Sequence, residues 1–121
     1  MSTPVTVVVA DDHPVFRAGI RDALEKGGQV EVVGEAADGA EALKVVRRLR
    51  PDVLLLDMNM PVMTGWDAAK ELKKDGAPII ALTAQKTHDE QVAAHEAGCD
   101  TFVEKPIDPA RLLEAVKRVL G

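Results

Sequence analysis

The chain has 121 residues, 46% of them hydrophobic and 2% aromatic, and a formal net charge of -5 at pH 7. This length suits one domain, residues 1–121, with an aliphatic core. The negative charge argues against direct binding to nucleic acid, and no apolar stretch approaches the roughly 20 residues of a membrane span. We expect no signal peptide, and the single cysteine cannot form an internal disulfide, so we expect a cytoplasmic location.

Five short apolar runs, rich in β-branched residues, are predicted to form strands. In chain order they cover Val5–Ala10, Val30–Ala36, Val53–Leu56, Ile79–Leu82 and Thr101–Glu104. Helical patterns fill the gaps and follow the last run, so strand and helix alternate five times. This order predicts an α/β fold with a mainly parallel sheet and helices on both faces.

The predicted helices have recognisable ends. Capping-box spacing begins the second helix at Asp38 and Glu41, and Asp108 before Pro109 begins the fifth. The other expected end residues are Pro14 and Gly27-Gly28 for the first helix, Thr64, Asp67 and Gly76 for the third, and Thr87, Glu90 and Gly98 for the fourth. The apolar faces are predicted to be Ala42, Val45, Val46 and Leu49 in the second helix, a thin set of Val92, Ala93 and Ala97 in the fourth, and Leu112, Leu113, Val116 and Leu120 in the fifth.

Strand composition predicts the strand order. The first, third and fourth runs are almost wholly apolar, which is typical of strands covered on both faces. The second and fifth runs carry Glu31, Glu35 and Glu104, as edge strands often do. The predicted order is therefore 2-1-3-4-5, a doubly wound, flavodoxin-like sheet with five helices. Ligands of such folds bind outside the carboxyl ends of strands one and three.

Polar residues gather at this edge of the predicted sheet. They are Asp11 and Asp12 after the first strand, Asp57 after the third, Thr83 ending the fourth and Lys105 after the fifth. Two unit charges about 4 Å apart repel by on the order of 4 kcal/mol at an effective dielectric of 20, so three carboxylates here need cations. Lys105 offsets one charge, and oxygen ligands without a nearby cysteine favour Mg²⁺.

This set of groups suits phosphoryl transfer. A divalent cation would polarise an incoming phosphoryl group, and Asp57 could attack it as a carboxylate nucleophile. Thr83 offers a hydroxyl donor and Lys105 an ammonium group for the phosphoryl oxygens. Transfer of this kind needs mostly positioning and charge neutralisation.

The sequence contains a pattern of four short motifs: Asp11-Asp12, Asp57, Thr83-Ala84 and Lys105-Pro106. With this pattern, the chain resembles the chemotaxis-Y-like receiver domain of two-component response regulators, and the resemblance extends from Val5 to Leu120. The resemblance implies that Asp57 takes its phosphoryl group from a histidine kinase or a phosphotransfer protein. It also implies Mg²⁺ held by Asp12, Asp57 and the backbone carbonyl of Asn59, with Asp11 acting largely through water. The chain would then be a phosphoacceptor switch, not an enzyme, with self-catalysed phosphotransfer and autodephosphorylation.

The resemblance also implies a switching mechanism. Thr83 and Lys105 would bind the phosphoryl group, Thr83 would move towards it, and Phe102 would turn inward as the aromatic switch residue. The output surface would be the fourth helix, fifth strand and fifth helix, which would contact a downstream protein or an effector domain. Family wording further suggests a cis peptide between Lys105 and Pro106. Phe102 is almost as readily interpreted as a plain packing residue of an edge strand.

Other function classes fit the sequence less well. A phosphatase of the haloacid dehalogenase type also uses an Asp nucleophile, but it needs a second Asp two residues later, where this chain has Asn59. An FMN carrier would place a hydroxyl-rich loop where Asp11 and Asp12 stand, and the dinucleotide fingerprint G-x-G-x-x-G is absent. His13, His88 and His95 have no metal-like spacing with Cys99 and are interpreted as surface residues, His13 lying beside the site.

Two uses of a receiver stay open. It could stand alone, or it could belong to a longer regulator, because Asp12-His13-Pro14-Val15-Phe16-Arg17 with Gly19-Ile20 resembles receivers that precede helix-turn-helix domains. We expect no direct contact of this chain with nucleic acid or a membrane. Phosphorylation-dependent dimerisation through the output surface stays open as well.

Overall fold

The computed structural model describes residues 4–58, 63, 65–83, 88–105 and 107–120. Within these ranges strands and helices alternate five times, as predicted. The elements are β1 Val5–Ala10, α1 Pro14–Glu25, β2 Val30–Ala36, α2 Gly39–Leu49, β3 Val53–Asp57, α3 Gly65–Lys74, β4 Ile79–Thr83, α4 His88–Ala97, β5 Thr101–Glu104 and α5 Pro109–Leu120. None of these helices is long and apolar enough to cross a lipid bilayer.

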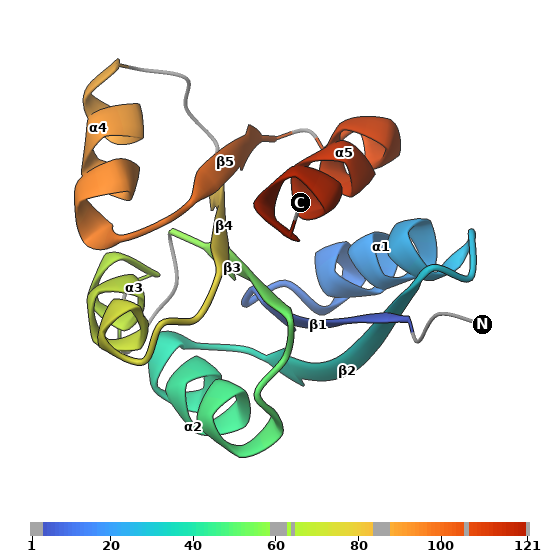
Figure 1. The fold of residues 1–121 in the computed structure, drawn as a ribbon, viewed down its shortest axis with the longest axis horizontal. Helices are drawn as coiled ribbons and strands as arrows, with labels where there is room; N and C mark the ends of the chain where they lie inside the picture. Colours follow the sequence, from blue (N-terminus) through green and yellow to red (C-terminus); the bar gives the residue numbers. More distant parts are fainter. Residues whose placement is uncertain (1–3, 59–62, 64, 84–87, 106, 121) are drawn as a thin grey trace.

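The strands form one parallel sheet in the order β2-β1-β3-β4-β5 (Figure 1), which confirms the predicted fold class. The Glu-bearing strands β2 and β5 lie at the edges, where one side of each strand has no neighbour in the sheet. All five residues of β3 are buried, including its last residue, Asp57. The carboxyl ends of β1 and β3 are therefore adjacent, and the chain reverses direction between them.

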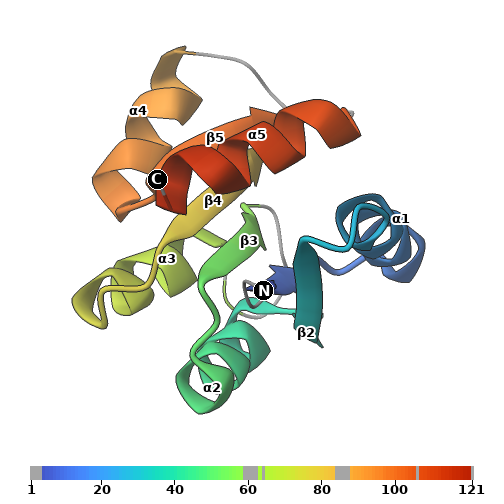
Figure 2. The same ribbon diagram turned by 45° about the vertical axis from the view of Figure 1, so that its right-hand side comes forward.

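Two helical layers cover the sheet (Figures 1 and 2). Helices α1 and α5 pack on one face, where Leu24 and Leu112 are buried with Leu55. Helices α2, α3 and α4 cover the other face, where Val46 and Leu72 are buried with residues that alternate with the first set along each strand. Burying a Leu or Val side chain contributes about 1.5–3 kcal/mol, so these two aliphatic clusters hold the layers together.

The helix ends mostly follow the predicted signals. The Asp38 side chain accepts a hydrogen bond of 2.8 Å from the Glu41 backbone N–H, and Asp108 accepts one of 2.9 Å from the Ala110 N–H. Thr64 and Thr87 lie outside the described residues. The buried faces of two helices were predicted one residue too long, because Leu49 is 38% and Leu120 is 43% exposed. Leu120 lies eight residues after Leu112, which rotates it about 80° away from that buried side chain.

Helix α2 ends on a residue with an unfavourable backbone conformation. Arg50 has φ 47° and ψ 61°, in the left-handed region, and its N–H donates to the Val46 carbonyl at 2.8 Å. A side chain in that region costs roughly 1–2 kcal/mol, and glycine avoids this cost. We expect Arg50→Gly to raise the free energy of unfolding by roughly 0.5–1 kcal/mol, measured by urea denaturation. The control Arg48→Gly, inside the helix, should lower it by about 1 kcal/mol; equal effects would contradict this account.

Helix α4 is weakly anchored, and the turn that follows it carries a buried thiol. Ala97 is buried, whereas Val92 is 39% exposed, so the predicted thin apolar face of α4 is confirmed for Ala97 and is wrong for Val92. Cys99 follows this helix and is buried in the same cluster as Ala97. Burial, with a smaller contribution from the charge of Asp100, raises the pKa of the Cys99 thiol to about 12. The thiol is therefore protonated and unreactive at neutral pH.

Candidate functional site

The site lies at the carboxyl ends of the central strands. Asp11 directly follows β1, and its backbone N–H donates to the Ala36 carbonyl at 2.9 Å, which continues the β1–β2 ladder by one residue. Asp57 ends β3 and pairs with Leu82 of β4. Both carboxylate residues are buried, with exposed fractions of 0% for Asp11 and 2% for Asp57. The strand ladders thus carry two acidic side chains to the same edge, as the sequence predicted.

Lys105 supplies positive charge to these carboxylates. Its backbone N–H donates to the Thr83 carbonyl at 2.7 Å, which extends the β4–β5 ladder and fixes the start of its side chain. Its Nζ lies 3.3 Å from Asp11 Oδ2 and 3.4 Å from Asp57 Oδ1. One ammonium group therefore bridges two buried carboxylates, and the buried setting makes this attraction stronger than it would be at the surface.

Phe16 holds the Lys105 ammonium from the other side. The Nζ atom lies 4.5 Å from the centroid of the Phe16 ring, in the geometry of a cation–π contact. Phe16 lies in the first turns of α1, just after the loop that carries Asp11 and Asp12. The sequence pattern did not predict a place for Phe16 in the site.

The two adjacent aspartates have different surroundings. Both Asp11 carboxylate oxygens have partners: Oδ1 accepts from the His13 N–H at 2.8 Å, and Oδ2 contacts Lys105. Arg17 also donates to the Asp11 backbone carbonyl. Asp12 is more open, with a side chain 30% exposed, yet its Oδ1 is buried and has no hydrogen-bond partner among the described residues. The only ion-pair contact of this oxygen among the described residues is with His13 Nδ1 at 3.0 Å, and a bound cation would satisfy it.

These residues could hold a metal ion. One ligand atom each from Asp11, Asp12, His13 and Asp57 can be chosen so that all lie within 4.8 Å of one another. Two of them, Asp11 and Asp57, are buried and share Lys105, so the uncompensated charge is concentrated on the Asp12 side. The set of oxygen ligands suits a hard divalent cation such as Mg²⁺. Asn59, named for its backbone carbonyl, lies outside the described residues.

The remaining predicted site residues lie around this cluster or outside the described ranges. Thr83 ends β4 one residue beyond the partner of Asp57 and is 4% exposed. Phe102 is partly buried on β5 beside Ala81 and packs against the α2–α4 cluster. Pro106, and with it the predicted cis peptide after Lys105, lies outside the described residues.

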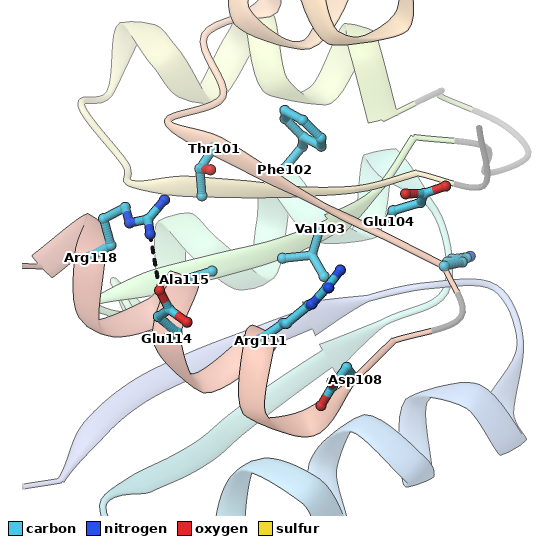
Figure 3. Close-up of a pocket in the computed structure, with 10 residues that line it drawn as sticks. Thr101, Phe102, Val103, Glu104, Asp108, Arg111, Glu114, Ala115 and Arg118 are labelled. Atoms are coloured by element: carbon cyan, nitrogen blue, oxygen red, sulfur yellow. Dashed lines mark hydrogen bonds and ion pairs between the residues drawn. The ribbon is translucent and has the colours of Figure 1, made fainter. Parts of the chain in front are cut away.

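A hollow of about 500 Å³ lies beside β5 and α5 (Figure 3). Charged side chains of α5 line it, and Arg118 contacts Glu114 at 3.0 Å across one turn of the helix. Phe102 and Val103 point to opposite sides of β5, Phe102 away from α5 and Val103 towards it. Strand β5 thus has the hollow and α5 on one side, and the Phe102 side chain on the other side.

The fold and site define a doubly wound, flavodoxin-like domain with an acidic, lysine-bridged site at its topological switch point. Residues 7–117 match the family described as the response regulator receiver domain. The chain belongs to this family and is a receiver domain of two-component signalling. The expectation from the sequence motif is confirmed, and the comparisons do not favour the phosphatase alternative.

Three of the similar proteins differ in their sequence identity to this chain and in coverage. The nitrate/nitrite response regulator protein NarP of Escherichia coli is 44% identical over 96% of this chain and 55% of its own length. The chemotaxis protein CheY of Thermotoga maritima is 37% identical over 93% of this chain and 95% of its own length. The solved signal receiver domain of the response regulator NarL from Mycobacterium tuberculosis is 36% identical, covers 98% of both chains and has a TM-score of 0.93. The chain spans about half the length of NarP, of the nitrate/nitrite response regulator protein homolog of Haemophilus influenzae, and of NarL of E. coli.

Proposed function

We propose that Asp57 is the phosphoacceptor of this receiver domain. The observation that carries the proposal is the 3.4 Å contact between Asp57 Oδ1 and Lys105 Nζ, deep in a site with two further aspartates. Asp57 lies at the end of the central strand β3, where a carboxylate has its position fixed by the sheet. A buried carboxylate beside a fixed cation is well suited to attack a phosphorus atom and then hold the charge that is added.

Asp12 and Asp57 are proposed to hold Mg²⁺ together with the Asn59 carbonyl, and Asp11 to act on it largely through water. The unpartnered buried oxygen of Asp12 supports this assignment. A bound Mg²⁺ would neutralise phosphoryl oxygens and polarise the phosphoryl group. Asp11, whose two oxygens already contact His13 and Lys105, would mainly orient these neighbours.

In the proposed reaction, a carboxylate oxygen of Asp57 forms a bond to phosphorus while the phosphorus–nitrogen bond of a phosphohistidine breaks. The imidazole leaves and takes a proton from water. The Lys105 ammonium group moves part of its contact from Asp57 to a phosphoryl oxygen. The Thr83 hydroxyl donates a hydrogen bond to another phosphoryl oxygen. Hydrolysis of the resulting acyl phosphate by water would return free Asp57 and inorganic phosphate, which makes the domain a reversible switch rather than a turnover enzyme.

The output of the switch is proposed to pass through α4, β5 and α5. Phosphorylation adds about -1.5 to -2 charge units, which would draw Thr83 and leave space for Phe102 to turn inward. Phe102 is only partly buried, and Val92 on α4 is exposed, so this side of the domain is loosely anchored. The hollow between β5 and α5 in Figure 3 lies on the same surface and offers charged groups to a partner.

Partners and location follow from the same proposal. The domain would act in the cytoplasm, where a histidine kinase or phosphotransfer protein would donate the phosphoryl group and a downstream protein or an effector domain would receive the signal. A longer regulator and a stand-alone receiver both agree with the relatives, because the chain spans 55% of NarP but 95% of CheY. Dimerisation of the phosphorylated form through the output surface belongs to the same proposal.

The direct test is incubation with acetyl phosphate and Mg²⁺, followed by intact mass spectrometry. We expect one added phosphoryl group per chain, and we expect a chelator to suppress the addition because the carboxylates then lack their cation. Phosphopeptide mapping after borohydride trapping should place the group on Asp57. Equal labelling with and without the chelator would refute the metal assignment, and no labelling under any condition would refute the phosphoacceptor proposal.

Phe16 provides a second test of this mechanism. We expect Phe16→Leu to slow phosphorylation by acetyl phosphate about two- to fivefold, because a cation–π contact worth about 0.5–1 kcal/mol no longer holds the Lys105 ammonium. Leucine keeps the side chain apolar, so packing of α1 is largely retained. Phe16→Tyr keeps the ring and should react at nearly the original rate. If both variants react equally fast, the ring does not position Lys105.

A further inference from the structure

His13 was predicted to be a surface residue beside the site, and the structure confirms this position. Its ring nitrogen belongs to the same group of close ligand atoms as the carboxylates of Asp11, Asp12 and Asp57. The side chain is 68% exposed, so the ring lies at the mouth of the site and not in the core. Histidine is the one member of this group that offers nitrogen instead of oxygen.

The backbone restricts where this ring can lie. His13 is the N-cap of α1, with φ -101° and ψ 107°, and its N–H donates to Asp11 Oδ1 at 2.8 Å. Pro14 follows at the first helical position and disfavours the helical conformation for His13. The hydroxyl or carboxylate oxygen that commonly caps a helix is absent at this residue, and its side chain makes no capping hydrogen bond. The ring is therefore available to the neighbouring carboxylates.

Two carboxylate oxygens lie close to the ring nitrogen. His13 Nδ1 is 3.0 Å from Asp12 Oδ1 and 3.2 Å from Asp11 Oδ1, and it donates a hydrogen bond to Asp11 when Nδ1 carries the ring proton. Two ligand atoms at right angles on one cation, each bonded at about 2.1 Å, are separated by about 3 Å. The Asp12 oxygen in this contact is the buried atom that has no hydrogen-bond partner among the described residues. In the tautomer with the proton on Nε2, Nδ1 and Asp12 Oδ1 both present lone pairs, and a cation between them would satisfy both atoms.

We propose that His13 Nδ1 is an additional ligand of the metal site and makes its metal preference differ from that of a carboxylate-only site. This inference rests on the proposed metal site at Asp12 and Asp57. Mg²⁺ binds oxygen ligands and gains little from imidazole, whereas Co²⁺, Ni²⁺ and Zn²⁺ bind imidazole well. The domain should therefore bind such transition-metal ions more tightly, relative to Mg²⁺, than the same domain without His13. The aspartate ligands are the same in both proteins, so the difference reports on His13.

The experiment uses the unphosphorylated chain with Co²⁺ and with Mg²⁺ as separate probes. Isothermal titration gives the dissociation constants for the chain as it is, for His13→Phe and for the control His95→Phe, whose histidine is exposed on α4. We expect His13→Phe to lower the ratio of the Mg²⁺ to the Co²⁺ dissociation constant by at least about tenfold, and His95→Phe to leave it unchanged. Proton NMR of the Co²⁺ form should contain one strongly shifted, exchangeable imidazole Nε2–H signal, lost in His13→Phe.

The NMR signal is read on the unaltered chain, so the inference is testable even if His13→Phe folds poorly. Co²⁺ binding without that signal, or with the same affinity ratio in His13→Phe, would overturn the role of His13 while the carboxylate metal site stands. In that case His13 only donates a hydrogen bond to Asp11. Failure of both cations to bind, equally in the chain and in Asp12→Asn, would overturn the proposed metal site and this inference with it.

Discussion

Asp57→Asn is expected to abolish the phosphoryl addition that acetyl phosphate and Mg²⁺ produce on this chain. Asparagine has the same shape as aspartate, so the end of β3 keeps its place in the sheet. Its amide oxygen is a poor nucleophile and carries no charge to bind a cation or Lys105. Intact mass spectrometry after incubation should therefore give only the unmodified mass.

A matched control separates this effect from a general loss of charge. Asp22→Asn removes one exposed carboxylate from α1, away from the site, and should be labelled at the original rate. Circular dichroism of Asp57→Asn should confirm that the fold is retained. A phosphoryl group still found on Asp57→Asn, for example on Asp12, would place the acceptor elsewhere in the cluster.

Gly65→Ala is expected to damage both the fold and the site. A Cβ atom at this position would lie 2.3 Å from the Asp57 carbonyl oxygen and 2.6 Å from the Met58 Cα, both of them backbone atoms. The Gly65 N–H also donates to the Met58 carbonyl at 3.3 Å, so the start of α3 rests on the strand that carries Asp57. Relief of this clash must move α3 or Asp57. We expect a loss of roughly 1–3 kcal/mol in the free energy of unfolding.

The same substitution should slow phosphorylation of the folded protein, because Asp57 would no longer sit at its distance from Lys105. The control is Gly19→Ala, in α1, where an added Cβ meets no atom within 4 Å. That change should raise stability by about 0.8–1 kcal/mol and leave the labelling rate unchanged, since alanine favours helix. If Gly65→Ala unfolds at the same urea concentration as the original chain, close packing of α3 on the Asp57 backbone is not required.

Much of the fold could be predicted because each strand reports its own environment. Val53–Leu56 is wholly apolar and therefore central, whereas Glu31 and Glu104 mark strands with an open edge. Knowing that parallel strands end at one edge was enough to bring Asp11, Asp57 and Lys105 together. The order of the strands and the meeting of these charges are thus consequences of composition and topology alone.

The details that were not predicted depend on how the helices are oriented in space, which the pattern of apolar residues does not indicate. Phe16 contacts Lys105 because α1 starts at Pro14, shortly after β1 ends at Ala10, and periodicity does not predict which way its first turns face. Arg17, similarly, donates to the Asp11 carbonyl from the first turns of α1. Leu120 is exposed because it lies on a different side of α5 from Leu112, and the left-handed conformation of Arg50 is found where the chain leaves α2.

The buried thiol of Cys99 makes it possible to time how often the α4–β5 corner comes apart. Of the two forms of a thiol, the thiolate is the one that is alkylated, and Cys99 is both shielded and protonated, with a pKa of about 12. Since the chain has one cysteine, a molecule alkylated on its cysteine has exposed Cys99 by opening. The rate of Cys99 alkylation can be compared before and after phosphoryl addition. A difference would measure how the added charge at Asp57 changes local opening between α4 and β5.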